Sequence, residues 1–438
     1  MKPPLFTLPN DAEPLATRLA RRRALFDRSL LANVARIFYD VAERGDQAIH
    51  DATKRFDKVS LDAIRLAPGT VAACAASIAP DLREAIDVAI GNIDEVNRAL
   101  MPEPVWRTEI RPGTMVGEKH TPLDAVGLWV PARKGPLVST AIMLAVAARV
   151  AGVERIVMAM PPCADGKPDA GTVAAASLSG AHEFVMGNGV AVLAALTLGT
   201  ESVPEVDGMF GPGPAAIAAA MATAFAYGKR TTVGLGPTDG LVLADDSADP
   251  AWVASDLLCE AEHGPDSVTV LVTTSPDLAA RVATEVEHQA ADVEEGRHTF
   301  LEQVFGPDGM GCIVVAPDLD AACEVVNDFA PEHCIVACDE PTTEAALGRI
   351  THAGEILLGH YTPFSAANYG IGITAVLPTS GFARAFSGVT CRDMLTCSTL
   401  GSLDANALAE LLPMIAILGR HEGLPCHVAS ARVRRPKT

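Results

Sequence analysis

A carboxylate and an imidazole stand three residues apart near the end of one predicted helix. The stretch 249–264 starts with Asp249, a good N-cap residue, and stops at Gly264, which suits a helix C-terminus. Glu260 and His263 are then neighbours on one face of its last turn and could together hold a divalent metal ion. The plainer interpretation is a surface Glu–His pair beside a helix end. Apolar residues at helical spacing predict a buried face made of Trp252, Val253, Leu257 and Leu258.

A second carboxylate–imidazole pair, Glu332 and His333, falls between two predicted elements. The pair follows a helical pattern over 319–329 and precedes an apolar run that is typical of a strand. Functional side chains often gather at such boundaries. A histidine titrates near neutral pH, so His333 could act as a general base that takes the proton of an alcohol. Without further support, charged loop residues remain the simpler interpretation.

Strands and helices alternate along most of the chain, which indicates parallel sheets covered by helices. The predicted strands cover residues 122–131, 155–160, 182–186, 240–244, 267–273, 311–316, 334–338 and 354–358. The predicted helices between them cover 138–151, 171–179, 190–198, 214–226, 250–263, 277–290 and 319–329. Helical patterns also occupy 10–58, 69–99 and the residues from 404 onward.

The composition narrows the class of protein. A chain of 438 residues is long enough for two or more domains, and its net charge of −20 disfavours nucleic acids and acidic membranes as partners. Ten scattered cysteines without a Cys-x-x-Cys motif predict reduced thiols and a cytoplasmic location. The N-terminus lacks the apolar run of a signal peptide, and no apolar stretch reaches the about 20 residues of a membrane span. The basic triplet 21–23 is expected to be a solvated face or a subunit contact.

Glycine-rich turns offer only a weak hint of a cofactor. No Gly-x-Gly-x-x-Gly fingerprint follows a predicted strand. The turns at 187–189 and 211–213 could bring backbone N–H groups to phosphates, or could merely reverse the chain.

Several separated segments together resemble the histidinol dehydrogenase family. They are 125–131, 139–153, 198–207, 211–213, 236–245, 256–264, 329–333, 358–363, 376–381 and 422–427. The resemblance implies an α/β fold with two incomplete Rossmann-like parallel-sheet domains, a helical N-terminal arm and a helical C-terminal tail. The expected division is an arm at 1–24, a first Rossmann-like domain at 25–125 and 245–388, a second at 126–244, and a tail at 389–438 that crosses to the partner of a homodimer.

The same resemblance implies an NAD-dependent and zinc-dependent alcohol dehydrogenase of histidine biosynthesis, with an active site that the two subunits share. Glu332 and His333 match the family's catalytic pair, with Glu332 activating water for a second oxidation. The family's metal ligands are Gln, His, Asp and His, and the matching positions here are Glu260, His263, Asn368 and His427. The amide and the carboxylate have exchanged places, so the set keeps its charge and could still hold Zn²⁺, or Mn²⁺.

Departures from the family pattern concentrate around substrate and cofactor. The expected substrate-binding residues are Thr238, Tyr369, Glu422 and Arg133, and the positions associated with NAD are Trp129, Ala191 and Pro214. An Asn-His pair of the family is Thr374-Ala375 here, so one imidazole expected at the substrate is missing. Lost hydrogen-bonding groups change substrate choice strongly. The family's substrate is L-histidinol, which is oxidised through the aldehyde to L-histidine. The changes also make a related polar amino alcohol or diol a predicted substrate.

Two other functions remain open. One is a non-catalytic homologue that binds a metal or a small ligand, which the changes at the NAD positions would favour. The other is a metallohydrolase in which Glu332 activates water without NAD.

Overall fold

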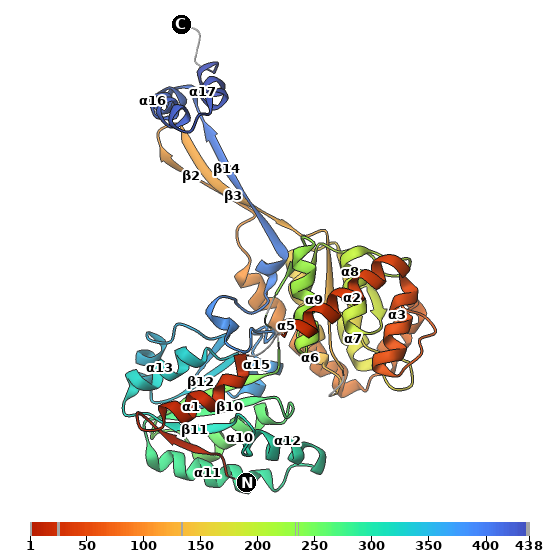
Figure 1. The fold of residues 1–438 in the computed structure, drawn as a ribbon, viewed down its shortest axis with the longest axis vertical. Helices are drawn as coiled ribbons and strands as arrows, with labels where there is room; N and C mark the ends of the chain where they lie inside the picture. The colour runs from red at the N-terminus through yellow and green to blue at the C-terminus, as the bar shows by residue number, and fades with distance from the viewer. Residues whose placement is uncertain (1, 24–26, 133–134, 233, 235, 435–438) are drawn as a thin grey trace. The chain divides into compact units, whose positions relative to one another are not determined.

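The computed structural model describes the chain except residues 1, 24–26, 133–134, 233, 235 and 435–438. It divides the chain into two compact units (Figure 1). The first unit comprises Met1–Leu100 and Asp124–Met394, and the second comprises Met101–Leu123 and Leu395–Thr438.

A six-stranded parallel sheet forms one half of the first unit. Its strand order is β1-β11-β10-β9-β12-β13. The strands are β1 (Leu5–Thr7), β9 (Asp239–Ala244), β10 (Val268–Thr273), β11 (Cys312–Val315), β12 (His333–Ala337) and β13 (Glu355–Leu358). Side chains alternate across the sheet: those of Leu241 and Leu243 face one buried cluster, and those of Val242 and Ala244 face the other.

Helices cover both faces of this sheet. One cluster contains side chains of α10 (Pro250–Ala261), α11 (Pro276–Ala290), α12 (Glu295–Phe305) and α15 (Phe364–Tyr369). The opposite cluster contains side chains of α1 (Ala12–Leu19), α13 (Leu319–Phe329) and α14 (Glu340–Leu347). Because both faces are buried, the central strands are mostly apolar, as the apolar runs in the sequence indicate.

A five-stranded parallel sheet with the order β6-β5-β4-β7-β8 forms the other half of the first unit. Its strands are β4 (Ala125–Trp129), β5 (Arg155–Met160), β6 (Glu183–Met186), β7 (Gly208–Phe210) and β8 (Arg230–Thr231). The helices that connect them are α6 (Val138–Ala151), α7 (Ala170–Ser179), α8 (Gly189–Leu198) and α9 (Ala215–Ala226). Helices α6 and α8 are alanine-rich and buried on nearly all sides because a second layer of helices covers them.

The helices of that second layer pack on a different sheet from the one that the expected domain division assigned to them. The layer consists of α2 (Arg28–Arg44), α3 (Asp46–Ala52), α4 (Pro68–Ser77) and α5 (Pro80–Leu100). These helices pack on α6, α7, α8 and α9, although residues 25–125 were expected in the first Rossmann-like domain. Conversely, β9 belongs to the six-stranded sheet, whereas the expected boundary at 244 assigned it to the second domain. Amphipathic helices show that they need a partner, but their sequence does not say which sheet supplies it.

The second unit contains a structure that the sequence analysis did not anticipate. Strands β2 (Val105–Arg111), β3 (Thr114–Pro122) and β14 (Leu395–Leu403) form an antiparallel sheet, followed by α16 (Ala405–His421) and α17 (Pro425–Arg432). The predicted tail over 389–438 is therefore not wholly helical. Strand β14 is Thr- and Ser-rich and mostly exposed, so it lacks the apolar pattern from which the other strands were recognised.

The helix that contains Glu260 forms as predicted, with two differences. The Asp249 side chain caps its N-terminus by accepting from the N–H of Ala251 at 2.8 Å, but the helix ends at Ala261. Trp252 is 44% exposed and contacts Tyr361, so its expected place in the buried face is wrong. In the part of the chain that the structure describes, no helix is both long and apolar enough to cross a membrane.

Candidate active site

Several polar side chains meet at the amino-terminal ends of neighbouring strands in the six-stranded sheet. His333 begins β12, and the parallel register places it beside Gly240 of β9 and Glu355 of β13. Thr238 and Glu332 immediately precede β9 and β12 and therefore lie at the same edge. The strand order reverses between β9 and β12, because β10 and β11 extend the sheet on one side of β9 and β12 lies on the other. Ligands of open α/β sheets usually bind at such a point on the carboxyl side, whereas this cluster lies on the amino side.

A buried carboxylate holds the imidazole of His333. Its Nδ1 lies 2.6 Å from Oε1 of Glu355, and each side chain is 5% exposed. This contact favours the tautomer with a proton on Nδ1 and leaves Nε2, which is 3.6 Å from Oε1 of Glu332, able to accept a proton. Burial disfavours the charged imidazole, but the carboxylates of Glu332, Glu260 and Glu355 outweigh it and raise the pKa of His333. The pair has the geometry of a general base with an orienting partner.

The hydroxyl of Thr238 lies between two carboxyl groups. Its Oγ1 is 2.7 Å from Oε2 of Glu260 and 2.9 Å from Oε2 of Glu332. A hydroxyl has one proton to donate, so the second contact requires a proton on one of the carboxyl groups. Burial, opposed by His333 and helped by the charges of Asp239 and Glu260, raises the pKa of Glu332 to about 8. When Glu332 carries this proton, its charge no longer raises the pKa of His333, and Nε2 of His333 can accept a proton.

Glu260 lies inside the protein with one unsatisfied oxygen. Its side chain is fully buried, and its Oε1 has no hydrogen-bond partner among the described residues. A Cβ at Gly240 would approach Cγ of Glu260 to 2.6 Å, so the glycine makes room for this side chain. A buried carboxylate oxygen without a donor is costly unless a cation or water completes it. This oxygen is therefore suited to bind a metal ion.

The other expected metal ligands differ in their surroundings. His263 is exposed just after α10, and its backbone N–H donates to the backbone carbonyl oxygen of Glu260 at 3.4 Å. Asn368 is half-buried on α15, a helix that packs on α10. His427 is exposed on α17 in the second unit. The carboxylate, imidazole and amide groups of this set are ligand types that zinc or manganese accepts.

The basic triplet 21–23 was expected to be a solvated face or a subunit contact, but its middle residue, Arg22, is buried inside the first unit. Its guanidinium is 4% exposed and donates to both carboxylate oxygens of Asp239, at 3.0 and 2.6 Å. It also donates to the carbonyl oxygens of Phe329 and Ala330, the residues that lead into Glu332. The Asp239 carboxylate in turn accepts from the backbone N–H of Glu332 at 2.7 Å. A basic run in a sequence does not show that one of its members folds inward.

Comparisons with known proteins cover almost the whole chain. The family model for histidinol dehydrogenase matches residues 20–435. A histidinol dehydrogenase of Synechocystis sp. is 39% identical and aligns over 92% of both chains. One of Methanothermobacter thermautotrophicus is 35% identical over 95% of this chain and 96% of its own. The crystal structure of histidinol dehydrogenase from Elizabethkingia anophelis matches with a TM-score of 0.91 at 28% identity, covering 99% of this chain and 98% of that one. This chain belongs to the histidinol dehydrogenase family.

Membership in the histidinol dehydrogenase family confirms the expected α/β class and an oxidoreductase that acts on a CH–OH group. An acetylating aldehyde dehydrogenase from Geobacillus thermoglucosidasius has a TM-score of 0.50 at 12% identity, which shows a shared fold alone. Among the side chains at this site, Glu355 was not predicted from the sequence. Its only local signal is a single acidic residue at the start of an otherwise apolar strand.

The three positions associated with NAD lie at the carboxyl edge of the five-stranded sheet. Trp129 ends β4, Ala191 lies in the first turn of α8, and Pro214 precedes α9. Strand order reverses between β4 and β7, which is where dinucleotides bind in related sheets. The Trp129 ring packs so closely on Gly189 that a Cβ there would lie 2.8 Å from it, and its buried N–H has no partner in the described residues.

The residues expected to bind the substrate lie in different surroundings. Thr238 lies in the cluster described above, and Tyr369 is 68% exposed at the end of α15. Glu422 is exposed in the second unit, after α16, and Arg133 lies outside the described residues. Thr374 is buried, and the side-chain amide of Asn97 donates to its Oγ1 at 3.4 Å. Thr374 therefore has an internal partner in place of a free group for a ligand.

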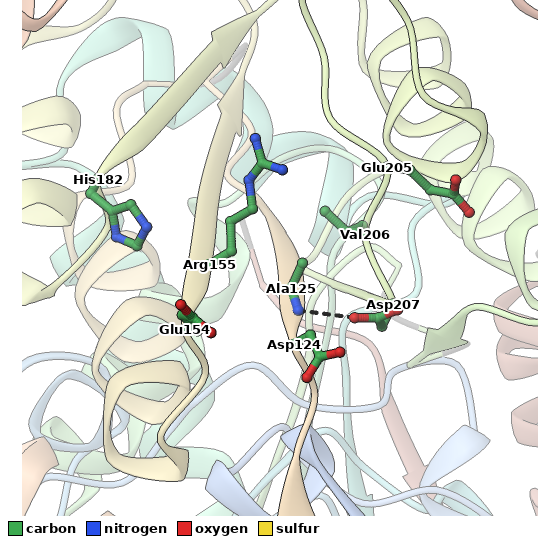
Figure 2. Close-up of a pocket in the computed structure, with 8 residues that line it drawn as sticks. All are labelled: Asp124, Ala125, Glu154, Arg155, His182, Glu205, Val206 and Asp207. Atoms are coloured by element: carbon green, nitrogen blue, oxygen red, sulfur yellow. Dashed lines mark hydrogen bonds between the residues drawn. The ribbon is translucent and has the colours of Figure 1, made fainter.

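A separate open hollow of about 680 Å³ lies at the amino-terminal ends of β4, β5 and β6 (Figure 2). Its lining is mostly charged and consists of Asp124, Ala125, Glu154, Arg155, His182, Glu205, Val206 and Asp207. The side chain of Asp207 accepts from the N–H of Ala125 at 2.9 Å and so supports the entry to β4 (Figure 2). None of the candidate catalytic or metal-binding residues lines it, and the edge is opposite to the one that carries Trp129.

Proposed function

We propose that the protein oxidises a polar alcohol with NAD, the alcohol being histidinol or a related amino alcohol or diol. The observation that carries this proposal is the buried arrangement of His333 with Glu355 on Nδ1 and Glu332 beside Nε2. His333 takes the hydroxyl proton of the substrate at Nε2, and Glu355 stabilises the imidazolium that results. For a second oxidation, Glu332 in its ionised form takes a proton from the water that adds to the aldehyde.

Glu260, His263 and Asn368 would hold a divalent cation, together with His427 of the partner subunit in a dimer. The unpartnered buried oxygen of Glu260 supports this assignment. When bound, zinc or manganese would lower the pKa of the substrate hydroxyl and stabilise the alkoxide. Thr238 then orients the Glu260 carboxylate by donating to it, while it accepts from Glu332.

We place NAD at the carboxyl edge of the five-stranded sheet, between β4 and β7. The reversal of strand order there supports this position. The buried indole of Trp129 forms one wall, and its unpartnered N–H is available to the cofactor. Ala375 in place of an imidazole favours a substrate whose side chain makes fewer hydrogen bonds than that of histidinol.

The active form is proposed to be a homodimer in which Glu422, just after α16, and His427 of α17 contribute to the partner's site. Exposed apolar side chains on α16 support an interface there: Met414 is 51% exposed, Ile417 58% and Leu418 51%. Such clustered apolar surface is typical of association sites. Mixing inactive His427→Ala and His333→Ala subunits then restores activity in the hybrid dimer, whereas unshared sites would stay inactive on mixing.

The function is tested by NADH formation with purified protein, NAD⁺, Zn²⁺ or Mn²⁺, and a panel of histidinol, other amino alcohols and diols. We expect turnover with at least one of them and its loss in His333→Ala. His182→Ala, which changes an exposed histidine at the hollow of Figure 2, serves as the control and keeps full activity. Absence of turnover with every alcohol under both metals would overturn the proposal.

A further inference from the structure

The antiparallel sheet of the second unit brings together three side chains that are typical metal ligands. Glu118 and His120 are two residues apart on β3, so they project from the same face. Cys397 of β14 is the direct cross-strand partner of His120 and lies on that face too. One ligand atom from each of the three lies within 4.8 Å of the others.

Two hydrogen bonds orient the side chains of His120 and Glu118. The Nδ1 of His120 lies 2.9 Å from the carbonyl oxygen of Glu103, which fixes the proton on Nδ1 and leaves the Nε2 lone pair directed at Glu118, with 3.9 Å between Nε2 and Oε2. The indole N–H of Trp106 donates to Oε2 of Glu118 at 2.9 Å and orients that carboxylate. A carbonyl behind a ligating histidine and a donor behind a ligating carboxylate are the usual outer contacts of protein metal sites.

A divalent cation placed among the three ligand atoms would attract the thiolate of Cys397 and the carboxylate of Glu118 at once. A thiolate, an imidazole and a carboxylate together favour zinc over magnesium or manganese, which prefer oxygen ligands.

We propose that Glu118, His120 and Cys397 form a second Zn²⁺ site, with water in the fourth position. The site differs in chemistry from the cation site of the proposed function, whose candidate ligands include no thiolate. It links β3 to β14, strands that are far apart in the sequence, and so ties together the sheet from which α16 and α17 continue. Its role is therefore to stabilise the unit that carries His427 and Glu422.

The test uses the full chain, stripped of metal with a chelator and titrated with Co²⁺ as a spectroscopic substitute for Zn²⁺. A thiolate–cobalt charge-transfer band in the near ultraviolet reports a sulfur ligand, so we expect one that saturates and that added Zn²⁺ displaces. Cys397→Ser abolishes the band, and His120→Gln weakens Co²⁺ binding at least about 10-fold. Cys74→Ser, a change at a half-buried cysteine of the first unit, leaves both unchanged.

Two outcomes would overturn the proposal: no charge-transfer band in the unmodified protein, or a band that survives in Cys397→Ser. Far-ultraviolet circular dichroism of each variant confirms that it is folded, which the exposure of Cys397 leads us to expect. The result is independent of the proposed function, because His333→Ala removes turnover but leaves the band in place. Loss of NADH formation with an intact band would instead count against the proposed function alone.

Discussion

The guanidinium of Arg22 and the carboxylate of Asp239 form a buried ion pair behind the backbone of Glu332. Asp239 accepts from Arg22 on one side and from the N–H groups of Glu332 and Ser380, at 2.7 and 2.6 Å, on the other. The ring of Phe329 lies 3.7 Å from Cζ of Arg22 and completes the enclosure. A residue near the N-terminus thereby fixes the segment that carries the proposed catalytic pair, Glu332 and His333.

Removing this arginine leaves a buried carboxylate without its counter-charge, so we predict that Arg22→Met lowers the free energy of unfolding by about 3 kcal/mol. Urea unfolding followed by circular dichroism measures it. The control is Arg44→Met, which breaks the exposed Arg44–Asp40 pair on α2 and should lower the free energy of unfolding much less. Equal losses of unfolding free energy in both variants would show that the buried pair stabilises the fold no more than an exposed pair does.

Arg22 also acts as a positioning residue for Glu332 and His333. The variant Arg22→Lys keeps the charge but cannot reach Asp239 and the two carbonyl oxygens at once. We expect kcat to fall about 10-fold in Arg22→Lys while KM changes little, because a small misplacement of the base affects the chemical step more than binding. A change confined to KM would contradict this role.

Glu355 is predicted to be essential for the basicity of His333. In Glu355→Gln the amide oxygen still accepts from Nδ1, but the negative charge that stabilises the imidazolium is gone, so kcat should fall about 100-fold or more. Glu344→Gln, a change at an exposed residue of α14, should have no effect. The nitrogen chemical shifts of His333 in NMR spectra give a second readout, and a lower pKa of His333 in the variant is expected even if the substrate is unknown. An unchanged pKa would refute the coupling.

Thr238 offers a test of the hydroxyl that joins two carboxyl groups. Thr238→Val has a similar shape without the hydroxyl, so Glu260 and Glu332 lose their shared partner and repel one another. We expect activity to fall at least about 10-fold and metal affinity to fall with it. Thr238→Ser retains the hydroxyl and should keep activity within a few-fold. Similar losses in Val and Ser variants would indicate that the methyl group, and not the hydroxyl, matters.

The Arg155–Glu183 pair beside the hollow of Figure 2 predicts a stability that depends on pH. The guanidinium of Arg155 donates to Oε1 of Glu183 at 2.6 Å and lowers the pKa of Glu183 below its usual range. The folded state then holds fewer protons than the unfolded state under mildly acidic conditions. The stabilisation is therefore complete above the ordinary carboxyl pKa of about 4.3 and disappears as the pH falls through the lower, folded value.

The measurement is the Tm of the protein and of Glu183→Gln at several pH values. The variant should melt lower at pH 7, and the difference should shrink as the pH falls below about 4. Glu154→Gln changes an exposed acid at the same hollow and should follow the unmodified protein at every pH. A difference that grows on acidification would contradict the assignment.

The sequence by itself determined the elements whose signals are local. Helix α6 follows the predicted 138–151 to the residue, helix α13 follows 319–329, and the buried strands lie within a few residues of their apolar runs. Capping residues, turns and apolar periods act over a few neighbouring positions, so one sequence displays them directly. The segments around Glu260 and His333, together with the other matching segments, also indicate the family from the sequence alone.

Only the tertiary structure decided how distant segments share these elements. It set Glu355 against His333 through the register of two strands, and it turned Arg22 inward to meet Asp239. It also paired the polar strand β14 with β3, which placed Cys397 opposite His120. These relations depend on strand order and on charges that pair across the chain, and neither leaves a periodic signal in the sequence. Long-range pairing therefore defines the candidate active site, while local patterning defines the elements that carry it.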